Sequence, residues 1–130
     1  MADPVVPVSW GELLDKIAIL EIKRLRLRAP EAVANAEREF SALAPALSAL
    51  EPAPVGLAEL RTALAAVNQR LWTIEDRIRE KDAAGDFGPD FVALARSVYR
   101  ENDERGRIKR AINTLLGSGL VEEKQYSAYD

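Results

Sequence analysis

Seven apolar residues that alternate spacings of three and four run through the middle of this chain: Leu57, Leu60, Leu64, Val67, Leu71, Ile74 and Ile78. This spacing places them on one side of an α-helix and is typical of helices that pack along another helix at a shallow angle, as in a coiled coil. A second apolar series begins after Pro89, and Gly85 lies between the two series as a helix stop. Because so short a link makes consecutive helices antiparallel neighbours, the sequence predicts a long antiparallel hairpin with helices at about 57–82 and 89–116.

The segment before the hairpin begins with a helix start signal. Ser9 and Glu12 match a capping box, in which the Ser9 hydroxyl accepts a hydrogen bond from the Glu12 amide and the Glu12 carboxylate accepts one from the Ser9 amide. A first helix is therefore expected at about 10–28. Residues 1–8 are expected to be extended, because they contain two prolines and precede this start signal.

A second helix is expected at about 31–50. Pro30 suits a first helical position, and Pro45 should kink or divide the helix because proline lacks a backbone donor. Residues 118–130 read as a polar C-terminal tail. At 130 residues the chain has the usual size of one domain, so the sequence predicts a single all-α domain over 1–130.

Composition narrows the chemistry available to this protein. The chain has no cysteine and no histidine, so it lacks the commonest zinc ligands and the commonest general base. Its 18 basic and 21 acidic residues give a formal charge of −3, which provides no global attraction to nucleic acid. No apolar run approaches the roughly 18 residues of a membrane-spanning helix. We therefore expect a cytoplasmic protein that binds no nucleic acid and does not insert into a membrane.

Polar residues interrupt the apolar side of the second hairpin helix. Glu101, Asn102 and Arg105 stand where the stripe should continue between Val98 and Ile108. If the hairpin reverses at about residue 85 or 86, facing residue numbers sum to roughly 171 or 172, because antiparallel helices rise equally. This register predicts a polar patch across both helices. Its candidate ligand-binding residues are Asn68, Trp72, Glu75, Asp76, Arg79, Glu101, Asn102, Asp103, Arg105 and Lys109.

Two kinds of explanation fit this polar patch. In the first, it is a polar network that fixes the register of the helices, with Arg105 paired to Glu101 one turn earlier. In the second, it is a ligand site. One variant would use Glu75, Asp76, Glu101 and Glu104 as weak candidate Mg²⁺ ligands, a pattern that is similar to the acidic pairs of the all-α nucleoside triphosphate pyrophosphohydrolases. The other would use Lys16, Arg79, Arg105 and Lys109 to clamp a dicarboxylate, as in a chorismate-mutase-like site.

Several blocks of the chain resemble those of an uncharacterised bacterial helical family, a domain of unknown function. The blocks are Gly11–Lys23, Val67–Arg79, Val98–Arg105, Ile108–Asn113 and Glu122–Tyr126. The positions that match the family pattern are Asp15, Lys16, Glu21, Asn68, Trp72, Glu75, Asp76, Arg79, Tyr99, Asn102, Asp103, Arg105, Lys109 and Asn113. The resemblance implies a genomic setting of polysaccharide and glycosyltransferase genes, and it implies no particular activity or catalytic residue.

The sequence thus favours an interaction or scaffold module that self-associates or binds a protein partner and needs no cofactor, since long apolar stripes build bundles between chains as readily as within one. The alternative is a binding or hydrolytic site for a nucleotide or another phosphate compound on the hairpin, and Mg²⁺ is the cofactor considered under this alternative. A leftover apolar surface would favour the first reading and a concave polar pocket the second.

Overall fold

The computed structural model describes residues 1–129, and Asp130, the last residue of the predicted tail, lies outside the described residues. The described chain folds into four α-helices and one 3₁₀ helix, with no strand among these residues. The elements are α1 (Trp10–Arg26), α2 (Pro30–Leu43), η1 (Ala44–Leu50), α3 (Leu57–Ala83) and α4 (Pro89–Leu116). The predicted all-α fold is confirmed.

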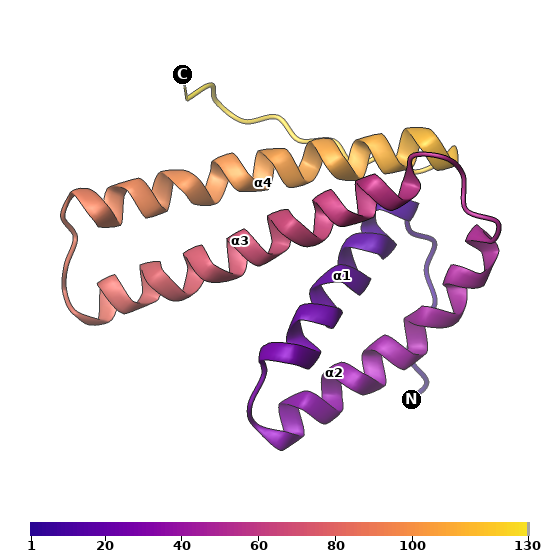
Figure 1. Ribbon diagram of the computed structural model, residues 1–130, viewed down its shortest axis with the longest axis horizontal. Helices are drawn as coiled ribbons and strands as arrows, with labels where there is room; N and C mark the ends of the chain where they lie inside the picture. Colours follow the sequence, from indigo (N-terminus) through magenta and orange to yellow (C-terminus); the bar gives the residue numbers. More distant parts are fainter. Residues whose placement is uncertain (130) are drawn as a thin grey trace.

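The helix boundaries follow the local signals closely. The predicted hairpin is α3 and α4, which lie side by side along their length (Figure 1). Helix α1 ends at Arg26, two residues before the predicted end, because Leu27 turns to an extended conformation with ψ 140°. The second helix is divided as predicted: it gives way to 3₁₀ geometry at Ala44, next to Pro45, which has no amide hydrogen to donate.

Only half of the predicted capping box forms at the start of α1. The Ser9 hydroxyl accepts a hydrogen bond from the Glu12 amide at 3.1 Å, as predicted. The predicted bond from the Ser9 amide to Glu12 was wrong, because the Glu12 carboxylate binds Lys109 of α4 instead. A tertiary ion pair has therefore replaced a local backbone bond.

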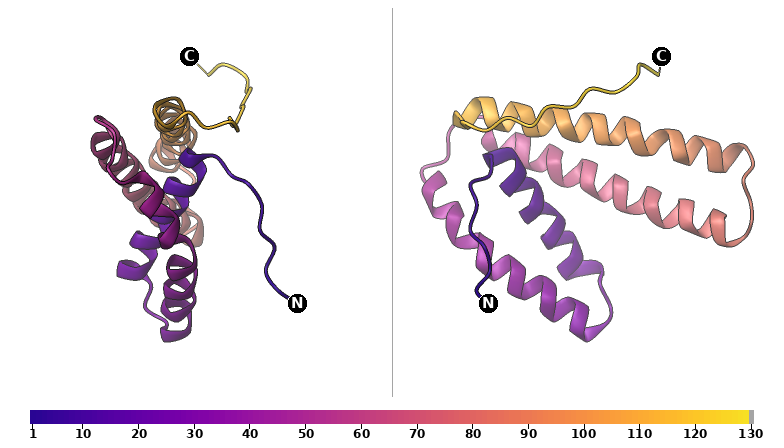
Figure 2. Two further views of the ribbon diagram at one scale, coloured as in Figure 1. Left: turned by 90° about the vertical axis from the view of Figure 1, so that its right-hand side faces the viewer. Right: turned by 180° about the vertical axis from the view of Figure 1, so that it is seen from behind.

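The helices form two pairs that diverge from a common end. α1 packs on α2 and on both hairpin helices, near the start of α3 and the end of α4 (Figures 1 and 2). The core lies at this common end and consists of Leu14, Ala18, Leu50, Leu57, Leu64, Val67, Ile108 and Ile112. Beyond the core, none of the residues 69–107 is buried. We call this part of the hairpin the arm.

Candidate functional site

The polar patch is organised around a carboxylate from the first helix. Asp15 of α1 is buried, with 2% of its side chain exposed. Its Oδ1 accepts hydrogen bonds from Asn68 Nδ2 of α3 and from Arg105 Nε of α4, both at 2.9 Å, and its Oδ2 accepts a second bond from the Arg105 guanidinium. These bonds raise the pKa of Arg105 above its ordinary value. One α1 side chain therefore joins both helices of the hairpin.

The predicted pairing of Arg105 with Glu101 was wrong. Glu101 lies on another side of α4, where its Oε2 accepts from Arg70 Nε of α3 at 2.9 Å. The register itself is confirmed, since the numbers of Arg70 and Glu101 sum to 171. The error came from considering only the hairpin, because the charge that neutralises Arg105 comes from a third helix.

Lys109 extends the network along α4. Its Nζ lies 2.8 Å from Glu12 Oε2, 2.7 Å from Glu122 Oε2 of the tail and 4.0 Å from Asp15 Oδ2, and only 7% of its side chain is exposed. Burial lowers the pKa of Lys109, but the hydrogen bonds to Glu12 and Glu122 outweigh it and raise the pKa above its ordinary value. The hydrogen bond from Lys109 lowers the pKa of Glu122. Lys109 therefore fastens both the start of α1 and the tail to α4.

A close helix crossing holds this network in place. The Gly11 amide donates to Asn113 Oδ1 at 2.7 Å, and a Cβ on Gly11 would lie only 2.5 Å from the Lys109 carbonyl oxygen. Glycine is therefore required at this point of α1. Gly11, Asp15 and Ile19 follow one another at spacings of four on α1 and meet the hairpin in turn, at Asn113, at Arg105 and at the groove described next.

A groove of about 510 Å³ opens where α1 begins to diverge from the hairpin. We call it the fork groove. Its lining residues are Ile19, Asn68, Leu71, Trp72, Glu75, Asp76, Arg79, Asn102 and Arg105. Seven of the ten predicted candidate residues therefore lie together. Two arginines and two carboxylates balance one another along its walls, so the groove presents no net positive charge to a phosphate.

Three of the predicted candidates lie outside the fork groove. Glu101 is held by Arg70, as described above, while Asp103 and Lys109 line a second groove of about 230 Å³ beneath the tail. The structure also separates the cations of the predicted dicarboxylate clamp. Lys16 pairs with Glu39 of α2 at 2.9 Å, away from the hairpin. That clamp is therefore not assembled.

The weak Mg²⁺ candidates do not converge either. Glu75 and Asp76 line the fork groove. Glu101 pairs instead with Arg70, and Glu104 pairs with Arg107, one turn farther along α4. Within residues 1–129, no group of three or more acidic side chains is arranged to hold a metal ion. A cation in the fork groove would therefore depend on Glu75 and Asp76 together with the oxygens of its ligand.

The site also contains residues that the predicted polar patch did not include. Asp15, Glu12 and Glu122 complete the network, and Asn113 receives the α1 backbone. The signal for Asp15 was present, because it interrupts the apolar side of α1 as Arg105 interrupts that of α4. Asp15 and Asn113 were also among the positions of the family resemblance. When polar residues of opposite charge interrupt the apolar sides of two helices, they are candidates to pair with one another.

The network is complete without a ligand. No buried side-chain nitrogen or oxygen in the described chain lacks a hydrogen-bond partner. A satisfied buried network specifies how helices meet, so its charges serve the packing of α1 against the hairpin. Asn68 and Arg105 of this network also line the fork groove, so the network and the groove share one wall.

Fold and site together define an all-α domain in which a buried ion-pair network fastens a helix to one end of a long hairpin and leaves the other end projecting. None of its described helices is both long and apolar enough to cross a membrane. A family model described as a family of unknown function (DUF6165) matches residues 5–129, and the chain belongs to this family. Comparisons with curated proteins and with solved structures gave no match.

Proposed function

We propose that this domain is a helical interaction module that self-associates through its arm. The observation that carries the proposal is the absence of any buried residue between 69 and 107, although the apolar stripe continues through Leu71, Ile74 and Ile78. At the core end of the hairpin, α1 covers the face of α3 that carries this stripe. Farther along, α1 diverges from the hairpin (Figure 1), and the tail packs on the α4 side of the arm instead, where Tyr129 lies against Tyr99 with ring centroids 4.6 Å apart.

The uncovered stripe gives self-association its driving force. Most helical stability in proteins comes from packing an apolar face, and an isolated pair of helices gains little of it. Removing apolar surface from water contributes about 25 cal/mol per Å², and Ile78, Leu94 and Val98 are only half-buried in the arm. A second arm packed against the first would bury them and give a four-helix arrangement.

Sedimentation velocity over a range of protein concentrations tests this proposal. The wild-type chain should associate as its concentration rises, and Ile78→Glu should remain monomeric because the new charge would be buried in the interface. Val55→Glu is the matched control, since Val55 lies outside the arm and is 97% exposed. A wild-type chain that stays monomeric at every concentration would refute self-association, as would an Ile78→Glu variant that associates normally.

The fork groove supports a second candidate function, the binding or hydrolysis of a nucleotide or another phosphate compound, with Mg²⁺ held at Glu75 and Asp76. The supporting observation is that seven of the ten candidate residues line one groove. Thermal unfolding with ATP or inorganic phosphate, with and without Mg²⁺, tests it: a ligand at 100 times its Kd stabilises by about 2.7 kcal/mol. The stabilisation should disappear in Arg79→Ala. A flat screen removes this candidate.

Further parts of the proposal rest on sequence alone. They are a cytoplasmic location, a bacterial origin, a genomic setting among polysaccharide and glycosyltransferase genes, coiled-coil packing in the arm, and independence of nucleic acid and cofactors. A survey of the genes that neighbour members of the family tests the genomic setting. Fractionation of cells that express the chain tests the location.

A further inference from the structure

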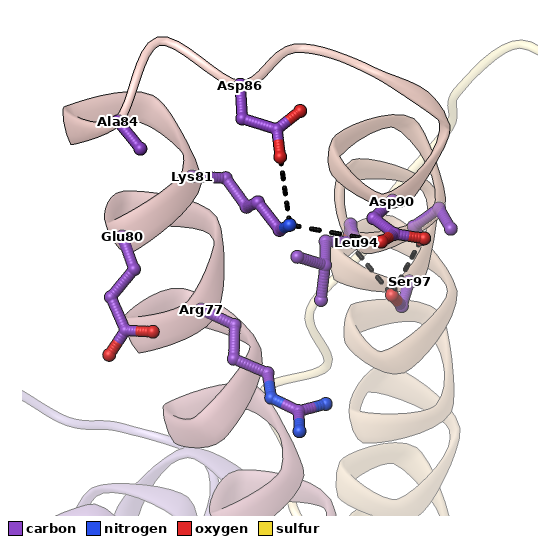
Figure 3. A pocket seen from close by; sticks show the side chains of 9 residues that line it. Arg77, Glu80, Lys81, Ala84, Asp86, Asp90, Leu94 and Ser97 are labelled. Atoms are coloured by element: carbon purple, nitrogen blue, oxygen red, sulfur yellow. Dashed lines mark hydrogen bonds and ion pairs between the residues drawn. The ribbon is translucent and has the colours of Figure 1, made fainter.

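The free end of the arm carries a pair of aromatic rings, one of them exposed, within an acidic surface. We call residues 80–91 the arm tip. Phe87 is 57% exposed and packs edge-to-face on Phe91, with ring centroids 5.2 Å apart. Figure 3 shows Lys81 reaching between Asp86 and Asp90, at 3.0 and 3.8 Å. The charged residues of the tip are Glu80, Lys81, Asp82, Asp86 and Asp90, which give a net charge of −3.

The end of α1, beyond the fork groove, has the opposite charge. Ile19 of α1 lines the groove, and the last turn of the same helix contains Lys23, Arg24 and Arg26. Arg26 lines a separate groove along α3, beside Arg70 and Ile74. Arg24, in the last turn of α1, pairs with Glu37 of α2. Lys23 and Arg26 take part in no ion pair with another described residue.

The length of the arm also suits contact between the tip of one copy and the fork of another. From Asn68 at the fork to Ala83 at the end of α3, the arm extends about 22 Å at a rise of ~1.5 Å per residue. α4 covers nearly the same length from Phe91 back to Arg105. In an antiparallel pair of arms, each tip therefore lies beside the fork of the other copy.

We infer that the fork groove receives the arm tip of a second copy of this chain, in a two-fold exchange in which each copy supplies one tip and one fork. This inference rests on the proposed self-association and names the surfaces that meet. Three observations support it: the groove continues the face that α1 already covers, the tip and the end of α1 have opposite charges, and the spacing of tip and fork suits a closed pair.

Each surface has a defined role in this arrangement. The Phe87–Phe91 pair is the aromatic anchor, and Ile19, Leu71 and Trp72 provide apolar surface for it, as at the centre of many interfaces. In this pair the acidic groups of the tip lie near the basic end of α1, which contains Lys23 and Arg26. Opposite charges there select the antiparallel orientation, because a parallel pair would bring the two acidic tips together.

Cross-linking between single-cysteine variants tests the geometry without background, since the chain contains no cysteine. Ile19→Cys marks the fork, and Ala84→Cys marks the tip. A short bismaleimide should link the two variants when they are mixed, but it should not link Ala84→Cys to itself, because the two tips lie at opposite ends of the pair. Gly119→Cys mixed with Ala84→Cys is the matched control and should give no product.

Charge reversal gives a second test that does not depend on cross-linking. Glu80→Lys with Asp82→Lys reverses the tip, and Lys23→Glu with Arg26→Glu reverses the fork. Each double variant alone should associate at least about tenfold more weakly than wild type, and an equimolar mixture should recover the affinity. Circular dichroism confirms that each variant is folded.

The outcomes separate this inference from the proposed function. A wild-type chain that never associates overturns both. Association that Ile78→Glu abolishes, without a cross-link between fork and tip and without recovery in the charge-reversed mixture, overturns the exchange of tips and leaves self-association through the arm standing. Cross-linking of Ala84→Cys to itself overturns the antiparallel arrangement.

Discussion

Replacing Arg105 with methionine should destabilise this protein far more than a surface substitution would. Methionine fills much of the same volume, so the change removes a charge without leaving a large cavity. The Asp15 carboxylate then stays buried, with the Asn68 amide as its remaining hydrogen-bond donor and Lys109 4.0 Å away. A buried charge without its partner is among the costliest defects in a protein interior.

The expected magnitude follows from the contacts. Breaking a buried ion pair by removing one partner costs about 3–5 kcal/mol. The side chain of Arg105 is 25% exposed, and Lys109 remains to compensate part of the charge on Asp15. Both reduce the loss, so we expect about 3 kcal/mol. For a chain of this size, that corresponds to a melting temperature lower by ~10 °C.

Urea unfolding at pH 7, followed by circular dichroism, measures this loss. The matched variant combines Asp15→Asn with Arg105→Met, because an asparagine at position 15 is neutral and its carbonyl oxygen still accepts from Asn68. It should be more stable than Arg105→Met alone by at least about 1 kcal/mol. A single variant that loses less than about 1 kcal/mol, or a double variant that is no more stable than the single one, would refute the assignment of Asp15 as the buried partner of Arg105.

Three further predictions concern the contacts around this network. Ser9→Ala should lower the free energy of unfolding by about 1 kcal/mol in a denaturant titration, through the lost helix cap. Gly11→Ala should cost about 1–3 kcal/mol in thermal melts, because its Cβ would meet a backbone oxygen at 2.5 Å, while Gly119→Ala, with open space around it, should change nothing. The pKa of Glu122 is lowered below 4.5 by Lys109, so the tail contact is present at neutral pH and is lost as the pH falls through that lowered pKa. The NMR amide signals of the tail should report this release in acid, and Glu122→Gln should show it already at pH 7.

The sequence predicted the helices because each is encoded by neighbouring residues. The alternating stripe of α3, the proline that opens α4 and the glycine that ends it all act over one or two turns. The hairpin register was also predictable, since equal rise and a short loop leave little freedom, and the Arg70–Glu101 pair agrees with it. Local physics therefore sufficed for the hairpin.

The partners of the polar residues depended on the tertiary structure. Arg105 has a carboxylate one turn away at Glu101, and nothing in the hairpin alone shows that it will bind Asp15, 90 residues earlier in the chain. That choice requires the position of α1, which Gly11 and Asn113 set through a close crossing. The interrupted apolar patterns mark Asp15 and Arg105 as residues that need partners, but they do not show which residues those partners are.

The sequence by itself thus determined which segments are helical, where they end and which of their faces are apolar, because side-chain spacing and backbone capping are local properties. Only the tertiary structure decided that α1 covers the core end of the hairpin and diverges from the arm (Figure 1). The angle at which helices cross depends on how whole surfaces pack. That angle takes α1 away from the arm and places seven of the ten predicted residues around one groove.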